Sequence, residues 1–470
     1  MLYIELDRSP HHQPYYLQIV EQTRNAIVSG QLTAGTQLPP TRQLASELGI
    51  ARRTVVVAYE ELCAQGYCTS HVGQGTIVAE IPVVQKENEV KTINGFPQWL
   101  SEKKPTINSK EDDSETISFT PGLPQIDYLS VKAMRQAFQR VINDFSDELA
   151  YHKKNNGISP LLQAICQYIL PNRGIKATPN EILITNGSQH SSSLLGLLFA
   201  SYGGSISYGV PGYLAIPRNF TSRGITGMPC PVDSDGIKLS EQALGARFHY
   251  VMPEHHFPTN ATLSPQRRAW LLQLAQEQDS LIIEDDYDSE FFYDRHPLPA
   301  LKSEDGGGRV IYMGTFSKVL FNSLRLGYIV AHPKIIQHLV ELRWQLDGGT
   351  SNILQLWVAE LIESGALERH LRRMRVHYRK KRDLIANYLK QIFTQWNWQL
   401  PSGGLQFWIE LPPNELAETV IHSLKEKGIG LYSGANYYDY LSQEATHRLI
   451  LGFGAVTKTE IHQAFNRLKD

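Results

Sequence analysis

From about residue 117 onward, short apolar runs alternate with longer amphipathic stretches of helical spacing. Short apolar runs separated by helices are typical of strands buried in a mainly parallel sheet. This part of the chain is therefore expected to fold as an α/β unit around such a sheet. The runs that carry this expectation are residues 182–184, 249–252, 281–283, 310–312 and 328–330.

Length, charge and cysteine content narrow the remaining possibilities. At 470 residues the chain exceeds the roughly 100–200 residues of one ordinary domain, which allows a small domain beside a large one. A formal net charge of −2 argues against a general polyanion binder. With no secretory signal and no apolar stretch long enough to span a membrane, we expect a cytoplasmic protein. The four scattered cysteines indicate reduced thiols and no metal site: Cys63, Cys68, Cys166 and Cys230.

The first 80 residues have the pattern of a small helical domain with a hairpin. Apolar residues recur at helical spacing over residues 15–28, 41–48 and 51–65, and Gly30, Gly49 and Gly66 end these segments. Residues 67–78 then indicate a β-hairpin with a glycine-rich tip. Three helices followed by a hairpin predict a winged helix-turn-helix, mostly α with a small β wing.

Residues 81–116 differ in character from both neighbours. The charged and polar runs 84–89 and 109–114 have little periodicity, which predicts a long, mostly solvated linker. Phe96, Trp99 and Leu100 in its middle leave open that part of it is ordered. The expected domains are therefore 1–80, a linker 81–116, and 117–470.

A DNA-binding surface is expected at the start of the third helix. Arg52, Arg53 and Thr54 in its first turn can enter a major groove, and Arg42 in the preceding helix is placed for a phosphate. The alternative is that these arginines are merely solvated and that the helices form an ordinary hairpin. Residues 1–80 hold five arginines and no lysine against seven acidic residues, so binding must depend on a few placed contacts and on dimerisation.

The segment 38–55 resembles the recognition motif of the GntR family of winged-helix repressors, and the resemblance continues through residues 58–62 to the wing at 73–76. Two positions depart from the family pattern. Ala51 replaces the hydroxyl residue that caps the recognition helix, at a cost of about 1 kcal/mol, and His71 stands where a wing arginine is common. The expected DNA-binding residues are Arg42, Arg52, Arg53, Thr54, His71, Gly73 and Gly75.

Lys318 follows an apolar run and stands between Ser317 and further apolar residues, with Arg325 seven positions later. A lysine is presented in this way when it forms a Schiff base with pyridoxal phosphate (PLP). Desolvation and a nearby cation lower the pKa of such an amine and make it nucleophilic. An exposed surface lysine fits this setting poorly.

Other residues of the large unit suit the same cofactor. Asp285 or Asp286, after the apolar run 281–283, can pair with a pyridinium nitrogen. Ser188 and Gln189 precede a helical stretch, where backbone N–H groups favour a phosphate. In the order of these residues, the unit from 117 to 470 resembles the fold-type I aminotransferases, and the whole chain resembles the MocR subfamily of GntR-type regulators. The resemblance implies a smaller C-terminal α+β subdomain.

The same resemblance assigns roles to individual residues. It selects Asp285 for the ring nitrogen, Tyr287 for the phenolic oxygen and Tyr213 for stacking on the ring. Arg325, with Thr315 or Ser317, would complete the phosphate site, and Tyr151 of a second subunit would reach the cofactor in a homodimer. The implied cofactor-binding set is Ser188, Gln189, Tyr213, Asp285, Tyr287, Thr315, Ser317, Lys318 and Arg325.

Three positions depart from the aminotransferase pattern. Phe257 stands where the family has an asparagine that contacts the phenolic oxygen. Arg448, the candidate for an effector carboxylate, lies two residues upstream of the usual position, on the same face of a strand. Ala215 cannot supply a second cation.

These features together predict a PLP-dependent, DNA-binding transcriptional regulator. It would sense PLP, a small amine or an amino acid through Lys318, and act on double-stranded operator DNA. The alternative is a catalytically active aminotransferase with an accessory DNA-binding domain. A third hypothesis, a simple repressor whose large domain only dimerises, predicts loss of the PLP residues, and these are present.

Overall fold

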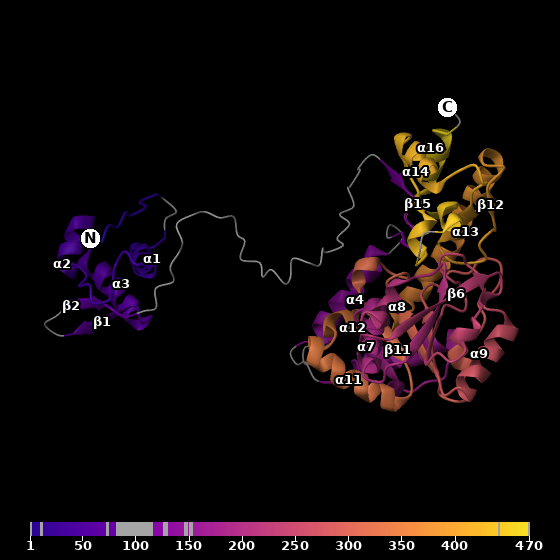
Figure 1. The fold of residues 1–470 in the computed structure, drawn as a ribbon, viewed down its shortest axis with the longest axis horizontal. Helices are drawn as coiled ribbons and strands as arrows, with labels where there is room; N and C mark the ends of the chain where they lie inside the picture. Colours follow the sequence, from indigo (N-terminus) through magenta and orange to yellow (C-terminus); the bar gives the residue numbers. More distant parts are fainter. Residues whose placement is uncertain are drawn as a thin grey trace. The chain divides into compact units, whose positions relative to one another are not determined.

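A computed structural model describes residues 2–9, 13–71, 75–80, 116–125, 130–144, 149, 154–439 and 442–468. The chain divides into two compact units, Met1–Lys110 and Glu111–Asp470 (Figure 1). The predicted linker lies almost wholly outside the described residues, so its character stays a prediction.

The N-terminal unit contains the predicted three helices and hairpin. Helices α1 (Tyr15–Val28), α2 (Thr41–Leu48) and α3 (Arg52–Ala64) precede the antiparallel strands β1 (Cys68–His71) and β2 (Gly75–Val78). The backbone of residues 36–38 also hydrogen bonds along β2, from Val78 N to Thr36 O and from Leu38 N to Thr76 O, both at 2.9 Å. The winged helix-turn-helix prediction is confirmed.

Local interactions fix the turn between α2 and α3. Gly49 ends α2 in the left-handed region (φ 63°), which a glycine adopts without strain. The Tyr59 hydroxyl of α3 donates to the carbonyl oxygen of Pro39 at 2.9 Å, which ties α3 to the segment that enters α2. Ala51 has the extended backbone of an N-cap residue but makes no side-chain cap.

An eight-stranded sheet is the centre of the C-terminal unit. Its order is β4-β11-β10-β9-β8-β5-β6-β7, and neighbours from β10 through β6 are parallel. Strand β11 is antiparallel to both its neighbours, and β7 is antiparallel to β6. The bounds are β4 (Ile182–Thr185), β5 (Ser205–Val210), β6 (Thr226–Asp233), β7 (Gly236–Ile237), β8 (Phe248–Val251), β9 (Leu281–Asp286), β10 (Val310–Thr315) and β11 (Gly327–Val330).

All five predicted apolar runs are strands of this sheet, so the expectation of a mainly parallel sheet is confirmed. Successive residues of a strand face opposite sides: Ile311 packs in one core cluster and Tyr312 in another. Helices therefore cover both faces: α4 (Val131–Asp144), α6 (Ser159–Ala164), α7 (Ser188–Ala200), α8 (Ala215–Thr221), α9 (Pro265–Glu277), α10 (Leu301–Glu304), α11 (Pro333–Asp347) and α12 (Asn352–Glu363).

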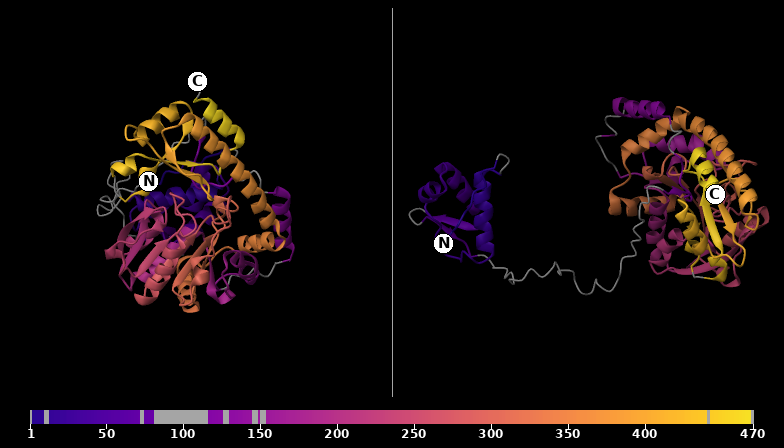
Figure 2. Two further views of the ribbon diagram at one scale, coloured as in Figure 1. Left: turned by 90° about the vertical axis from the view of Figure 1, so that its right-hand side faces the viewer. Right: turned by 90° about the horizontal axis from the view of Figure 1, so that it is seen from above.

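A smaller subdomain follows the long helix α13 (Ala366–Ile392). Its antiparallel sheet has the order β12-β13-β16-β15, and Figures 1 and 2 show these orange and yellow segments gathered at one end of the unit. The bounds are β12 (Asn397–Trp398), β13 (Gln406–Glu410), α14 (Ala417–Glu426), β14 (Ile429–Gly430), β15 (Tyr432–Ser433), α15 (Gln443–Thr446), β16 (Arg448–Gly452) and α16 (Lys458–Asn466). Strand β3 (Ile117–Ser118) pairs with β14, so the start of the unit joins its C-terminal part. The implied α+β subdomain is confirmed.

Within the described ranges, no helix is both long enough and apolar enough to cross a membrane.

The uncapped start of α3 can be tested directly. Ala51→Ser should stabilise the N-terminal unit by about 1 kcal/mol, because a serine oxygen can accept a hydrogen bond from a first-turn N–H group. Amide hydrogen exchange in α3, followed by mass spectrometry on the full-length chain, should become slower. Ala51→Val, the matched control, offers no oxygen to a first-turn N–H group and should not slow the exchange. Unchanged exchange in the serine variant would contradict this account.

Candidate cofactor site

Four strands of the large sheet end at the candidate site. Strands β4, β5, β9 and β10 share one direction, and their carboxyl ends lead to Ser188, Tyr213, Asp285 and Lys318 respectively. Ligands of open α/β sheets bind at this edge, because turns that are far apart in sequence meet there. The sheet order therefore brings the predicted cofactor residues to one edge.

Lys318 lies just after β10 with a largely buried side chain. Its Nζ donates to the carbonyl oxygen of Gly122 at 2.6 Å. Burial lowers the pKa of Lys318, and the carboxylates of Asp288 and Asp285 oppose this effect. A lowered amine pKa enlarges the unprotonated, nucleophilic fraction near neutral pH.

The two adjacent acids at the end of β9 have different partners. Asp285 Oδ2 accepts from the Tyr250 hydroxyl at 2.8 Å, and burial raises the pKa of Asp285 to about 7. Asp286 Oδ2 accepts from Arg173 Nε at 2.6 Å and from the Tyr312 hydroxyl at 2.8 Å. An ion pair with Arg173 already neutralises Asp286, so Asp285 is the acid left for a ring nitrogen.

Groups that suit an anion lie at and near the start of α7. Gly187, with φ 88°, precedes Ser188, and the first N–H groups of a helix have no partner within it. The Arg325 guanidinium carbon lies 3.5 Å from the point where a Cβ on Gly187 would stand. Thr315 Oγ1 accepts from Ser317 N at 3.1 Å, whereas the buried Ser317 Oγ has no partner among the described residues. An unsatisfied hydroxyl, an arginine and a helix N-terminus are the kinds of group that bind a phosphate.

Aromatic rings form one wall of the site. The rings of Tyr213, Tyr287 and Tyr437 each meet Phe257 edge to face, with centroid distances of 6.0, 6.1 and 5.0 Å. The Tyr213 hydroxyl accepts from Gln189 Nε2 at 2.8 Å, which fixes a partly exposed ring. Phe257, in the place of the family's asparagine, thus provides packing for the tyrosines and no polar contact.

Arg448 begins β16 in the small subdomain. Its Nη1 lies 2.9 Å from Glu410 Oε2 and its Nη2 lies 3.1 Å from Glu444 Oε1. Both terminal nitrogens of the guanidinium therefore already contact carboxylates. Arg448 lies in a strand, as the sequence predicted. Its contacts with Glu410 and Glu444 could not be inferred from the sequence.

The expected DNA-binding residues lie in the N-terminal unit. Arg42, Arg52 and Arg53 are exposed, and Arg52 Nε donates to Thr41 Oγ1 at 3.3 Å. Thr54 is half-buried in the first turn of α3, and Gly75 begins β2 with φ 81°. Gly73 and Tyr151 lie outside the described residues, and of His71 only the backbone, in β1, is described.

Sequence reasoning missed the residues that support this site. Tyr250, Arg173 and His255 each contact one acid between 285 and 288, and Gln406 Nε2 lies 3.4 Å from the Tyr287 hydroxyl. Tyr250 and Asp285 both lie near the end of an apolar run. This shared position was the one feature of the sequence that could have indicated their contact. The other partners come from a helical turn (Arg173), a loop (His255) and strand β13 (Gln406), whose positions depend on the tertiary fold.

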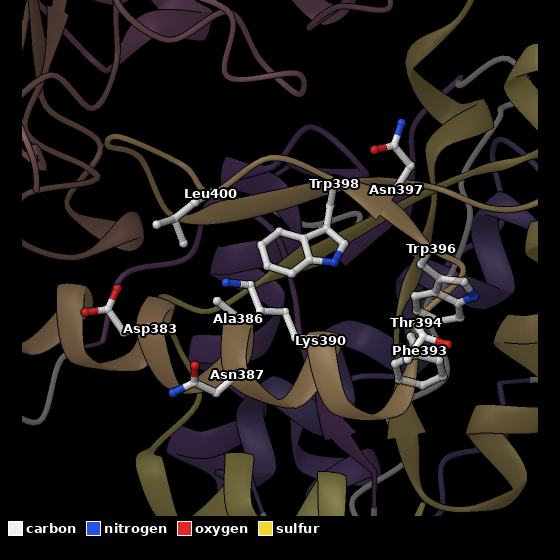
Figure 3. A pocket seen from close by; sticks show the side chains of 10 residues that line it. All are labelled: Asp383, Ala386, Asn387, Lys390, Phe393, Thr394, Trp396, Asn397, Trp398 and Leu400. Carbon is white, nitrogen blue, oxygen red and sulfur yellow. The ribbon is translucent and has the colours of Figure 1, made fainter.

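A separate hollow of about 590 Å³ lies on the small subdomain, between α13 and the chain in and after β12 (Figure 3). Asn387 and Lys390 come from α13, and Trp398 and Leu400 from the facing segment. It contains none of the predicted cofactor residues, so the edge of the large sheet remains the candidate site.

Comparison with known proteins supports both units. Residues 122–468 match the family described as aminotransferase class I and II, and residues 15–78 match the bacterial regulatory proteins of the gntR family. The chain is similar to the kynurenine aminotransferase structure of Pyrococcus horikoshii, with a TM-score of 0.72 and 26% identity over 79% of this chain and 97% of that one. It also resembles the α-aminoadipate aminotransferase LysN of Thermus thermophilus, with a TM-score of 0.68 and 28% identity over 75% and 91%.

Relatives named as regulators span most of the chain. The chain is 32% identical to the probable rhizopine catabolism regulatory protein MocR of Rhizobium meliloti, over 82% of this chain and 78% of that protein. It is also 32% identical to the transcriptional regulator TauR of Rhodobacter capsulatus, over 89% and 88%. The chain therefore belongs to the MocR subfamily of GntR-type regulators, which join a helix-turn-helix domain to an aminotransferase class I and II domain.

Proposed function

We propose that this protein is a PLP-dependent, DNA-binding transcriptional regulator of the cytoplasm. Its C-terminal unit senses PLP, or a small amine or amino acid, through Lys318. The observation that carries the proposal is that one chain contains both a set of residues suited to PLP and a winged helix-turn-helix. Lys318, Asp285 and the unsatisfied Ser317 hydroxyl meet at one sheet edge, and a winged helix precedes them.

The residues of the site divide the task of holding the cofactor. PLP supplies an aldehyde that captures amines and a ring that withdraws electrons. Lys318 would provide the amine that holds it covalently, and Asp285 would keep the ring nitrogen protonated. Ser188, Gln189, Thr315, Ser317 and Arg325 would hold the phosphate, while Tyr213 would pack on the ring and Tyr287 would donate to its phenolic oxygen. Arg448 remains a candidate contact for an effector that carries a carboxylate.

The cofactor site gives the first prediction. Lys318→Ala should abolish the covalent adduct that borohydride fixes, because it removes the amine that would form the imine. Lys390→Ala, an exposed lysine of the hollow in Figure 3, serves as the matched control and should leave the adduct intact. Mass spectrometry of the reduced protein measures the adduct. An unchanged adduct in Lys318→Ala would remove this lysine from the site.

The DNA-binding residues give the second prediction. Arg42→Ala should weaken binding to operator and unrelated DNA alike and lower the salt slope by about 1, as the loss of a phosphate contact does. Arg52→Ala and Arg53→Ala should weaken operator binding by about 1–3 kcal/mol and relax its sequence preference. Fluorescence anisotropy over a salt series measures both effects. Arg24→Ala, on α1, is the control; equal losses in all four variants would contradict these assignments.

The homodimer gives the third prediction. Five arginines and no lysine in residues 1–80 allow few phosphate contacts for each winged helix, so tight binding requires two copies on paired half-sites. Analytical ultracentrifugation should find a dimer at working concentration, and an operator with one half-site deleted should bind far more weakly. A monomer that binds a single half-site tightly would refute the proposal.

An active aminotransferase is the second candidate function. The presence of Lys318, Asp285 and Tyr213 favours it, as does the likeness to aminotransferase structures. A turnover assay with a panel of amino donors and a 2-oxo acid acceptor separates the two functions. Stoichiometric binding without turnover supports the regulator, and multiple turnovers support the enzyme.

A further inference from the structure

The charge of Arg448 is already balanced within the protein. Glu410 stands opposite Arg448 in the register of β13 and β16, and Glu444 approaches the guanidinium from α15. A ligand carboxylate at this arginine would have to displace one glutamate or join two like charges. The ion pairs therefore disfavour an effector whose recognition depends on a carboxylate.

Two buried acceptor atoms lack partners instead. Asp288 Oδ2 and Gln406 Oε1 are buried and have no hydrogen-bond partner among the described residues. The two side chains belong to residues that are only 2% and 0% exposed. An unsatisfied buried acceptor costs free energy, so a group that donates to it gains a corresponding advantage.

The geometry around Gly404 brings these two side chains together. A Cβ on Gly404 would stand 3.0 Å from Asp288 Oδ2 and 3.8 Å from Gln406 Nε2. The Gln406 amide is oriented by Asn260: its Nε2 donates to Asn260 Oδ1 at 2.8 Å, while Asn260 Nδ2 donates to the Gln406 carbonyl at 3.0 Å. This pairing leaves Oε1 as the free acceptor. We call Asp288 Oδ2 and Gln406 Oε1 the acceptor pair.

The acceptor pair adjoins the cofactor site. Gln406 Nε2 lies 3.4 Å from the Tyr287 hydroxyl. Among charged groups, Asp288 acts most strongly on the Lys318 ammonium, ahead of Asp285. Asp288 therefore belongs to the surroundings of Lys318, and Gln406 to those of Tyr287.

The charges nearby select an uncharged donor over a cation. His255 Nδ1 contacts Asp288 Oδ1 at 2.8 Å, and the carboxylates of Asp288 and Glu254 outweigh the effect of burial and raise the pKa of His255. His255 thus already contacts the other carboxylate oxygen of Asp288, and the Lys318 ammonium lies under the influence of the same carboxylate. A second ammonium would add positive charge in the surroundings of Lys318, whereas a hydroxyl donates without adding charge.

We propose that the effector is an amino alcohol: a primary amine without a carboxylate, whose hydroxyl donates to one atom of the acceptor pair. This inference rests on the proposed sensing of amines through Lys318 and names their chemical class. It differs from recognition of an amino acid at Arg448, because the discriminating group would be a hydroxyl.

A matched ligand series tests the proposal on the full-length, PLP-loaded protein. Propylamine, 3-aminopropan-1-ol, propane-1,3-diamine and β-alanine differ only in one terminal group, and two- and four-carbon homologues extend the series. Calorimetry and the operator-binding assay give the affinities. At the best chain length, the amino alcohol should bind about ten-fold more tightly than the alkylamine, because it satisfies a buried acceptor. The diamine and the amino acid should bind no better than the alkylamine.

A variant then locates the effect. Gln406→Leu should lower the ratio of amino alcohol to alkylamine affinity, measured on the fraction of the protein that holds the cofactor. Gln163→Leu, a change of the same type at an exposed position of α6, should keep the ratio. If Gln406→Leu loses the cofactor, the ligand series on the unmodified protein still decides.

The outcomes separate the two proposals. Equal affinity for all amines, or tightest binding of β-alanine, overturns the amino alcohol subsite and leaves amine sensing intact. A preference for the diamine overturns the choice of an uncharged donor. If no amine changes the cofactor spectrum or operator binding, amine sensing itself fails and the inference fails with it.

Discussion

The burial of four carboxylates between Glu284 and Asp288 is the constraint on which the C-terminal unit depends. A buried carboxylate is costly unless it is paired, hydrogen bonded or protonated. Each of these acids meets the requirement differently. Glu284 accepts from two backbone N–H groups, Asp285 from Tyr250, Asp286 from Arg173 and Tyr312, and Asp288 contacts His255.

These partners come from separate parts of the unit, so the acids also fix its assembly. Arg173 ends the helical segment after α6, Tyr250 lies in β8, and His255 follows that strand. A shift of any one of them would leave a charge in an apolar interior. The same arrangement leaves Asp285, with a pKa raised to about 7, and one oxygen of Asp288 available to a ligand. The same contacts therefore determine both the stability of this sheet edge and which of its acids can bind a ligand.

The sequence was most informative where structure is decided locally. Glycine stops and apolar spacing placed α1 and α2 at their observed ends, and apolar runs located five strands. Strands β5 and β6 were missed because serine, glycine and proline interrupt their apolar pattern. The site partners were missed for a different reason. Tyr250 reaches Asp285 only because β8 and β9 are neighbours, and the two glutamates beside Arg448 depend on the register of β13 and on the position of α15.

The contacts of residues 117–122 have a practical consequence for preparing fragments of the protein. The aminotransferase match begins at residue 122, yet β3 at 117–118 pairs with β14, Gly452 N donates to the Phe119 carbonyl at 2.9 Å, and the Gly122 carbonyl accepts from Lys318. An effector fragment cut at the family boundary would lose an edge strand and a fully buried phenylalanine. It would also turn Gly122 into a charged chain end beside the lysine. The folded C-terminal unit therefore begins before residue 122, where the aminotransferase match begins.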